Sequence, residues 1–156
     1  MDRKINSQLC GITGEYYVAA ELSRRGYLAA ITLRNSDGVD IIVSSIDGDK
    51  LISIQVKSTQ GKRKWILNKK VENDSTTNKY FIFVHLPNEV EDKPEFYLVR
   101  AQELANKIYS GHRRWLKEPG KNGRIRKDSD VRQFDPKYFQ DELIGWEELI
   151  TIIESK

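Results

Sequence analysis

GVDIIVSSIDGDKLISIQVKST, residues 38–59, is the stretch that decides the fold of this chain. Asp47-Gly48 stands between two apolar runs, and Asp-Gly is among the strongest short-range signals for a β-hairpin. We therefore predict two antiparallel strands, Val39–Ile46 and Asp49–Lys57. Because side chains alternate along a strand, one face of this hairpin is an apolar ladder suited to a core.

The length of the turn decides which polar residues meet on the other face. A two-residue loop at 47–48 pairs Asp40 with Gln55, and their Cβ atoms are then roughly 4.5–5.5 Å apart. Lys57 lies on the same face, diagonal to Asp40. A four-residue loop at 47–50 pairs Asp40 with Lys57 instead, which keeps the group together, and a three-residue loop requires a bulge.

These polar groups suit a metal site for cleaving phosphodiesters. Mg²⁺ takes oxygen ligands, usually one or two carboxylates together with waters and substrate phosphate, and Mn²⁺ is the alternative ion. Asp40 is the expected central ligand, and the Gln55 amide and the Val56 carbonyl offer further oxygens. Glu15 is expected to bind from a helix, directly or through a water. Lys57 would orient or deprotonate the attacking water, or stabilise the pentacovalent transition state.

Glu15 is placed by a helix that we predict for Ser7–Arg25, ended by Gly26 after two basic residues. At 100° per residue Glu15 lies at the margin of the apolar stripe of this helix, so it can lean over the edge of the sheet. The residues of that expected stripe are Leu9, Ile12, Tyr16, Ala19 and Ala20.

Each of these residues also has an ordinary structural role. A Gln and a Lys two positions apart on a strand are common on a solvent face. Asp40 follows Asp37-Gly38 and fits a turn-associated acid, and Glu15 fits a surface helix acid. Only the joint arrangement favours a functional site.

Composition sets wider limits. A chain of 156 residues with 38% hydrophobic and 31% charged residues is typical of a single globular domain, 1–156, with one substantial core. We expect no membrane span, because no apolar run approaches the ~20 residues required. We also expect no secretory signal after Met1–Lys4. The lone Cys10 excludes a disulfide framework and fits a cytoplasmic protein.

Two basic segments are the expected contacts with nucleic acid. The first surrounds Trp65, and the second, between Gly111 and Arg132, has eight basic residues against three acidic ones. Arginine and aromatic side chains stack on bases while lysines neutralise phosphate, although a charge run is as often a solvated loop. The residues assigned to these contacts are Lys62, Arg63, Lys64, Lys69, Lys70, Arg113, Arg114, Lys121, Arg124 and Arg126.

The rest of the chain predicts an α/β protein. The uninterrupted apolar run Tyr80–Val84 is typical of a buried strand. Residues 111–136 have little periodicity and predict a long basic loop, and residues 145–154 predict a C-terminal helix. The other expected elements are strands at Leu28–Leu33 and Phe96–Val99, a turn at Asn35–Gly38, a hairpin or strand within Lys62–Lys70, a loop at Asn73–Lys79 and a helix at Ala101–Tyr109.

The first 60 residues resemble the PD-(D/E)xK nuclease superfamily, and more narrowly its branch of archaeal Holliday-junction resolvases and restriction enzymes for modified DNA. The resemblance is carried by Gly14-Glu15, Gly38-Val39-Asp40 and Gln55-Val56-Lys57-Ser58-Thr59. No Pro precedes Asp40. Gln55 stands where Glu or Asp is usual, which makes the motif a Gln-x-Lys variant.

This resemblance implies a restriction-endonuclease-like αβββαβ core with a mixed central sheet flanked by helices. It also implies Mg²⁺-dependent cleavage of DNA and a homodimer. By position, Glu15 corresponds to the helix acid, Asp40 to the metal aspartate and Lys57 to the catalytic lysine.

Three functions follow, in this order. The first is a metal-dependent nuclease, a DNA endonuclease. The second is a non-catalytic nucleic-acid-binding module on a nuclease-like fold, which Gln55 favours because it removes one negative charge from the metal shell. The third is an interaction protein that uses the Tyr80–Val84 sheet and the terminal helix to dimerise.

Overall fold

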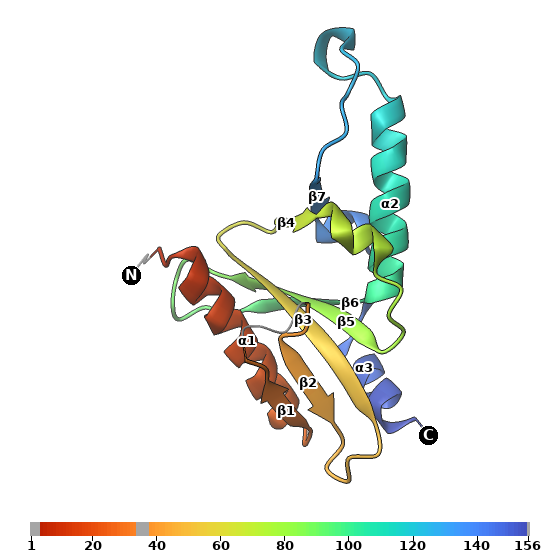
Figure 1. Ribbon diagram of the computed structural model, residues 1–156. Coiled ribbons are helices and arrows are strands. Elements are labelled where there is room, and N and C mark those ends of the chain that lie inside the picture. The colour runs from red at the N-terminus through yellow and green to blue at the C-terminus, as the bar shows by residue number, and fades with distance from the viewer. Residues whose placement is uncertain (1–3, 34–37, 156) are drawn as a thin grey trace.

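The computed structural model describes residues 4–33 and 38–155, so most of the turn predicted at Asn35–Gly38 lies outside the described residues. A six-stranded sheet in the order β1-β2-β3-β5-β6-β8 forms its centre (Figure 1). The strands are β1 (Leu28–Ile31), β2 (Ile41–Ser44), β3 (Leu51–Gln60), β5 (Lys79–Leu86), β6 (Glu95–Arg100) and β8 (Leu143–Ile144). In this part of the chain, no helix combines the length and apolar character needed to cross a membrane.

The sheet is mixed because its central pair, β3 and β5, is parallel while its other pairs are antiparallel. The chain crosses from β3 to β5 through the strand β4 (Trp65–Asn68) and the 3₁₀ helix η1 (Lys69–Asn73). This connection takes the place of the full α-helix between the third and fourth strands of the expected core. β4 does not join the main sheet but pairs with β7 (Val131–Phe134) in a separate two-stranded ribbon.

The predicted hairpin register is confirmed, although the loop is longer than predicted. β2 and β3 pair from Ser44–Leu51 to Ile41–Ile54, the register that the two-residue loop requires. The strands instead end at Ser44 and Leu51, and a turn in which the Gly48 N–H donates to the Ser45 carbonyl (3.0 Å) closes the connection. The longer loop preserves the register because it removes two residue pairs symmetrically.

One face of the sheet is covered by α1 (Ser7–Ser23) and α3 (Trp146–Glu154), the helix that spans most of the 145–154 segment. Even-numbered residues of β3 point to this face, where Ile54 and Val56 are buried. The first hydrophobic cluster, on this face, also contains Val18 and Leu22 of α1 and Leu149 and Ile153 of α3.

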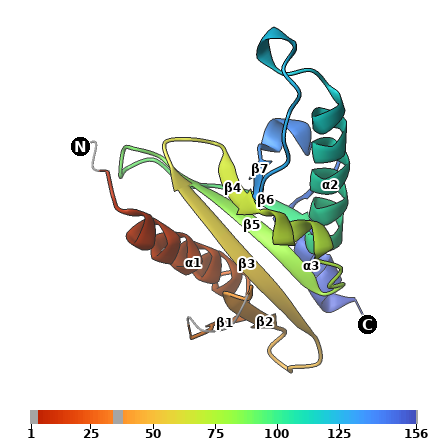
Figure 2. The same cartoon turned by 45° about the horizontal axis from the view of Figure 1, so that its top comes forward.

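The other face carries a second hydrophobic cluster under α2 (Ala101–Lys117) and the β4–β7 ribbon (Figure 2). Phe81 and Phe83 of β5 point to it, and the Phe83 ring stacks on Phe134 of β7 at 3.7 Å. Trp65 of β4 packs edge-on against Phe83 at 5.5 Å. This second layer covers only part of the sheet face.

The apolar stripe predicted for the first helix is wrong in part, since of its residues Ala19 packs against the first hydrophobic cluster while Leu9, Tyr16 and Ala20 are exposed. Leu9 and Tyr16 are 50% and 63% exposed, and the buried residues of α1 are Cys10, Gly14, Val18 and Leu22. The buried residues recur every four positions, and the first two, Cys10 and Gly14, are small and give little apolar signal in the sequence. Glu15 nevertheless remains at the margin of this buried stripe and is half-buried.

The long basic loop predicted for 111–136 is also wrong in part. α2 continues to Lys117, and Val131–Phe134 forms β7, so only 118–130 connects them, with one short 3₁₀ turn, η2 (Lys121–Gly123). The last buried residue of α2 is Ile108. Beyond it the helix has no core to face, so its sequence carries no apolar period.

Gly14 allows α1 to lie directly on β3. A Cβ at this position would lie 1.8 Å from Ser58 Oγ and 3.0 Å from Ser58 Cβ. We expect Gly14→Ala to destabilise the protein by about 1–3 kcal/mol because the helix or Ser58 must move. Urea unfolding followed by circular dichroism measures this change.

Gly11→Ala is the matched control, because nothing lies within 4 Å of a Cβ at that helical position. It should stabilise the protein by about 0.5–1 kcal/mol, the usual gain for Gly→Ala in a helix. Adding Ser58→Ala to Gly14→Ala should restore part of the loss. Equal stability of the two single variants would show that α1 is not seated on β3 at Gly14.

Candidate functional site

Asp40 lies where β2 separates from β3. Its N–H donates to the Ile54 carbonyl (2.9 Å), and its Oδ2 accepts a hydrogen bond from the Val56 N–H (2.7 Å). Ile54 is already the register partner of Ile41, so the regular ladder ends there. Asp40 therefore does not form the regular backbone pair with Gln55. Its side-chain carboxylate, and not a backbone carbonyl of β2, accepts the hydrogen bond of the next N–H of β3 on this side, that of Val56.

β3 has an open edge beyond this point. From Val56 to Gln60 it pairs with β5 on one side, while the ladder with β2 has ended on the other. In a strand the N–H and C=O of one residue point the same way, so the Val56 carbonyl faces the open edge beside the Asp40 carboxylate. The Asp40 carboxylate, held by the Val56 N–H, and the Val56 carbonyl thus both present oxygen atoms at this edge of the sheet.

Gln55 and Lys57 lie on the face that carries the second hydrophobic cluster. Their register partners on β5 are Phe81 and Phe83, which belong to that cluster. Both polar side chains are partly buried. The Asp40 carboxylate lies between them along β3, bonded to the Val56 N–H.

Glu15 comes from the other side. α1 packs on the face that buries Ile54 and Val56, which is opposite to the face of Gln55 and Lys57. It follows Gly14, which contacts Val56 and Ser58 along the open edge. The structure therefore brings Asp40 to Val56 and sets Gln55 and Lys57 on one face, while Glu15 follows Gly14 on the helix that packs on the other face.

A lysine that sequence reasoning missed lies beside Gln55. A Cβ at Gly38, where φ is +75°, would lie 3.0 Å from Lys79 Nζ and 3.7 Å from Gln55 Oε1. Lys79 Nζ donates to Asp74 Oδ2 at 2.7 Å, in a largely buried ion pair. Gly38 is thus required both for its positive φ and for this close approach.

The Lys79–Asp74 pair places a largely buried, neutral ion pair near Gln55. Burial disfavours ionisation of Asp74, but hydrogen bonds from Lys79 and Thr76 outweigh it and lower the pKa of the carboxyl. The position of Lys79 near Gln55 could not be predicted from the sequence. It results from the parallel pairing of β3 with β5, which aligns Lys79 with Ser53.

The oxygen donors fit a hard divalent cation. Asp40, Glu15, the Gln55 amide and the Val56 carbonyl are donors of the type that Mg²⁺ or Mn²⁺ prefers. Within residues 4–33 and 38–155, no three or more His, Cys, Asp or Glu side chains gather as they would in an all-acid or zinc centre. A metal here would depend on amide, carbonyl, water and phosphate oxygens beside one or two carboxylates.

The open edge leads to a hollow of about 560 Å³ between the start of α1 and the end of β3. Cations and hydroxyls are part of its wall, and Ser58, which follows Lys57, is among them. The polar residues of this wall include Lys4, Ser7, Thr59, Gln60, Lys62 and Asn88. The hollow borders β3 beyond Val56, and its wall does not include Asp40, Gln55 or Lys57.

The first basic segment is partly neutralised. Arg63 donates two hydrogen bonds to Glu95, at 2.6 and 2.7 Å. Lys69 pairs with Asp130 at 2.7 Å, and Lys64 lies 3.7 Å from Asp135. Lys62 and Lys70 are exposed. The assignment of this segment to nucleic-acid contacts stays a prediction, with Lys62 and Lys70 as its least restrained cations.

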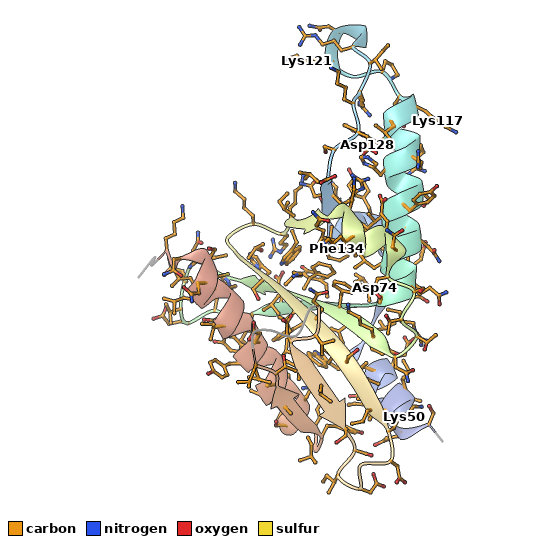
Figure 3. The ribbon with its side chains drawn as sticks, in the orientation of Figure 1. Lys50, Asp74, Lys117, Lys121, Asp128 and Phe134 are labelled. Carbon is orange, nitrogen blue, oxygen red and sulfur yellow. The ribbon has the colours of Figure 1, made fainter. Side chains whose placement is uncertain are left out.

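The second basic segment forms a projection that we call the arm: the C-terminal half of α2, Tyr109–Lys117, with the return segment 118–130. Figure 3 shows Lys117 and Lys121 at its far end, away from the sheet. Arg113, Arg114, Lys121 and Arg124 are exposed on it. Arg126 is more restrained, since its Nη1 donates to the Trp115 carbonyl (2.9 Å) and its guanidinium lies 4.7 Å from the Trp115 ring centre.

Comparison with solved structures supplies a match to this fold. The structure of Hjc, a Holliday junction resolvase from the archaeal hyperthermophile Archaeoglobus fulgidus, is similar with a TM-score of 0.50 and 12% sequence identity. The match covers 89% of this chain and 93% of that chain. No protein-family model and no curated protein sequence matches this chain.

The expected fold class is confirmed by this likeness. The chain has a restriction-endonuclease-like fold, with a mixed central sheet flanked by helices, as Hjc does. At 12% identity the likeness concerns the fold alone.

The Arg63–Glu95 pair gives a test of this electrostatic arrangement. The hydrogen bonds from Arg63 lower the pKa of Glu95 from 4.5 to about 2. Stability from the pair is therefore complete above pH 4.5 and disappears as the pH falls toward about 2. We expect Glu95→Gln to lower the urea midpoint at neutral pH, with a difference from wild type that shrinks across this window.

Glu91→Gln, at an exposed position in the β5–β6 connection, is the control and should show no such window. A Glu95→Gln difference that stays constant with pH would mean that Arg63 does not hold Glu95. Arg63 would then be available to a phosphate.

Proposed function

We propose that this protein is a metal-dependent nuclease that hydrolyses phosphodiester bonds, and that its substrate is DNA, cut internally. The observation that carries the proposal is the Asp40 carboxylate, held by the Val56 N–H at the open edge of β3. Gln55 and Lys57 flank Val56 on the same strand, in a fold that is also that of a Holliday junction resolvase.

The metal would be held by Asp40, the Val56 carbonyl and the Gln55 amide, with Glu15 as a direct or water-mediated ligand. When bound, Mg²⁺ or Mn²⁺ supplies an activated water and offsets negative charge on the phosphate. The Val56 N–H fixes the Asp40 carboxylate before any substrate binds. Lys57 orients or deprotonates the attacking water, or stabilises the negative charge of the transition state.

The basic residues would contact the DNA backbone. Contacts of lysine and arginine with phosphate position a duplex without specifying its sequence, so the proposal includes no sequence preference. Binding should weaken steeply as salt rises, because each phosphate contact releases counterions. A homodimer, which the family resemblance implies, would double these contacts across two strands.

A second candidate is a nucleic-acid-binding module without catalysis. Gln55 is neutral where the related motif carries an acid, and the described residues gather no group of three or more acids, histidines or cysteines. This candidate retains the fold and the basic surfaces and loses only the reaction.

Asp40→Asn and Lys57→Met should each reduce nicking of supercoiled plasmid in Mg²⁺ by about 10²-fold or more. Asn keeps an oxygen that can accept the Val56 N–H, so the fold is retained while the charge is lost. Both variants should still bind DNA in a gel-shift assay, because neither residue belongs to the basic segments.

Asp49→Asn and Lys93→Met are controls that make the same chemical changes at exposed loop positions. They should nick like wild type, and EDTA should stop the reaction in every active protein. Undiminished nicking by either site variant contradicts the proposed site. Binding without nicking by the wild-type protein in both Mg²⁺ and Mn²⁺ supports the second candidate.

Gln55→Glu tests the metal ligand without an activity assay. A carboxylate adds negative charge to the shell, so Mg²⁺ should bind roughly tenfold more tightly, measured by calorimetry. Gln133→Glu makes the same change at an exposed position of β7 and should leave the affinity unchanged. Equal affinities of Gln55→Glu and wild type would exclude Gln55 as a ligand.

A further inference from the structure

The arm ends in a small closed loop. The Gly120 N–H donates to the Arg124 carbonyl at 2.8 Å, and the Gly123 N–H donates to the Gly120 carbonyl at 3.1 Å. A Cβ at Gly120 would lie 3.1 Å from the same Arg124 carbonyl, so the two strands of the loop are in contact. The loop therefore has a defined shape at the far end of the projection (Figure 3).

Ile125 follows this loop and is 91% exposed. Single exposed apolar residues are common on proteins, so exposure alone indicates nothing. The position of Ile125 is more informative, because it stands between an exposed Arg124 and an Arg126 that is fixed to Trp115. An apolar side chain is thus held outward between two cations.

The arm is braced along its length. His112 Nε2 and Asp128 Oδ1 are 2.7 Å apart and join α2 to the return segment, and the His112 ring stacks on Trp115 at 5.4 Å. At the base, the buried Arg132 bonds to Glu72 of η1 and to the Asp128 carboxylate. A braced projection can push an apolar tip into a partner without first becoming ordered.

The arm rises from the sheet face that carries Gln55 and Lys57. Phe83, the register partner of Lys57, stacks on Phe134 of β7, the strand that follows the return segment. About nine residues of α2 extend past its last buried residue, a length of roughly 13 Å at 1.5 Å per residue. A duplex bound at the candidate site would therefore have the arm beside it.

We propose that the arm enters the minor groove of duplex DNA and that Ile125 inserts between two base pairs, with Arg124 and Lys127 on the flanking phosphates. This inference rests on the nucleic-acid-binding part of the proposed function. Proteins that bend DNA from the minor groove commonly use an apolar wedge of this kind beside cations, because a bent duplex contacts more of the protein. Insertion would present the backbone to the site in a distorted form.

An anionic membrane is the other surface that cations around an isoleucine could suit. The nuclease-like fold and the shared face of arm and site favour DNA over a lipid surface.

The test uses the full chain with Asp40→Asn, so that DNA is bound without being cut. A short duplex carries 2-aminopurine at several positions, whose fluorescence rises when the base is unstacked. We expect the protein to raise this fluorescence, and Ile125→Ala to reduce the rise at least about threefold. The affinity of Ile125→Ala for DNA should change less than the fluorescence. The variant loses the contact of Ile125 with the bases, but it also avoids the free-energy cost of unstacking them.

Ile46→Ala is the matched control, since Ile46 is 76% exposed in the β2–β3 loop at the opposite end of the molecule. It should give the same fluorescence rise as the Asp40→Asn protein. Arg124→Ala should weaken binding and reduce its salt dependence by about one phosphate contact.

Bound DNA whose fluorescence does not depend on Ile125 overturns the insertion and leaves the proposed nuclease intact. If unstacking depends on Ile125 but the wild-type protein, with Asp40 intact, does not cleave DNA, the insertion is retained and the proposed nuclease is overturned. No binding to DNA at low salt overturns both. Ile125-dependent binding to phosphatidylserine vesicles in that last case would assign the arm to a membrane.

Discussion

The alternation of side chains along β3 is the constraint on which the rest of the structure depends. Its even-numbered residues are buried under α1 and α3, and its odd-numbered residues face α2 and the β4–β7 ribbon. A shift of one residue in the β2–β3 pairing would move Ile54 and Val56 into the polar setting of Gln55 and Lys57. The hydrophobic core and the candidate site are therefore fixed by the same register.

The Asp40–Val56 hydrogen bond converts the end of a strand into a site. A β-strand that simply stopped would leave the Val56 N–H without a partner, which is unfavourable for a buried residue. The carboxylate supplies the partner and is itself oriented in return. This one hydrogen bond satisfies the backbone of β3 and also orients the Asp40 carboxylate. It therefore contributes both to stability and to the proposed chemistry.

Much of this could be predicted from the sequence because it depends on local rules. The Asp47-Gly48 turn and the apolar alternation gave the correct β2–β3 register, although the loop is longer than two residues. The errors occur where a long-range contact decides. The buried stripe of α1 depends on Gly14 facing Ser58, and the Lys79 position depends on the parallel pairing across the β3–β5 crossover.

The helical part of the arm beyond Ser110 could not be predicted from the sequence for a related reason. Periodicity marks a helix only where one of its sides is buried, and the half of α2 beyond Ile108 stands away from the body. Its order comes from interactions between polar groups, such as His112 with Asp128 and Arg126 with Trp115. Hydrophobic pattern carries no information about such an element.

The short outermost strands of the sheet limit self-association through its edges. The two margins of the sheet are formed by β1, with four residues, and β8, with two. Unpaired backbone at a sheet margin is a template for fibrous self-association, and brief strands offer few consecutive groups to such a template. The longest strands, β3 and β5, lie inside the sheet, and the part of β3 that its ladder with β2 leaves open lies beside α1 at Gly14.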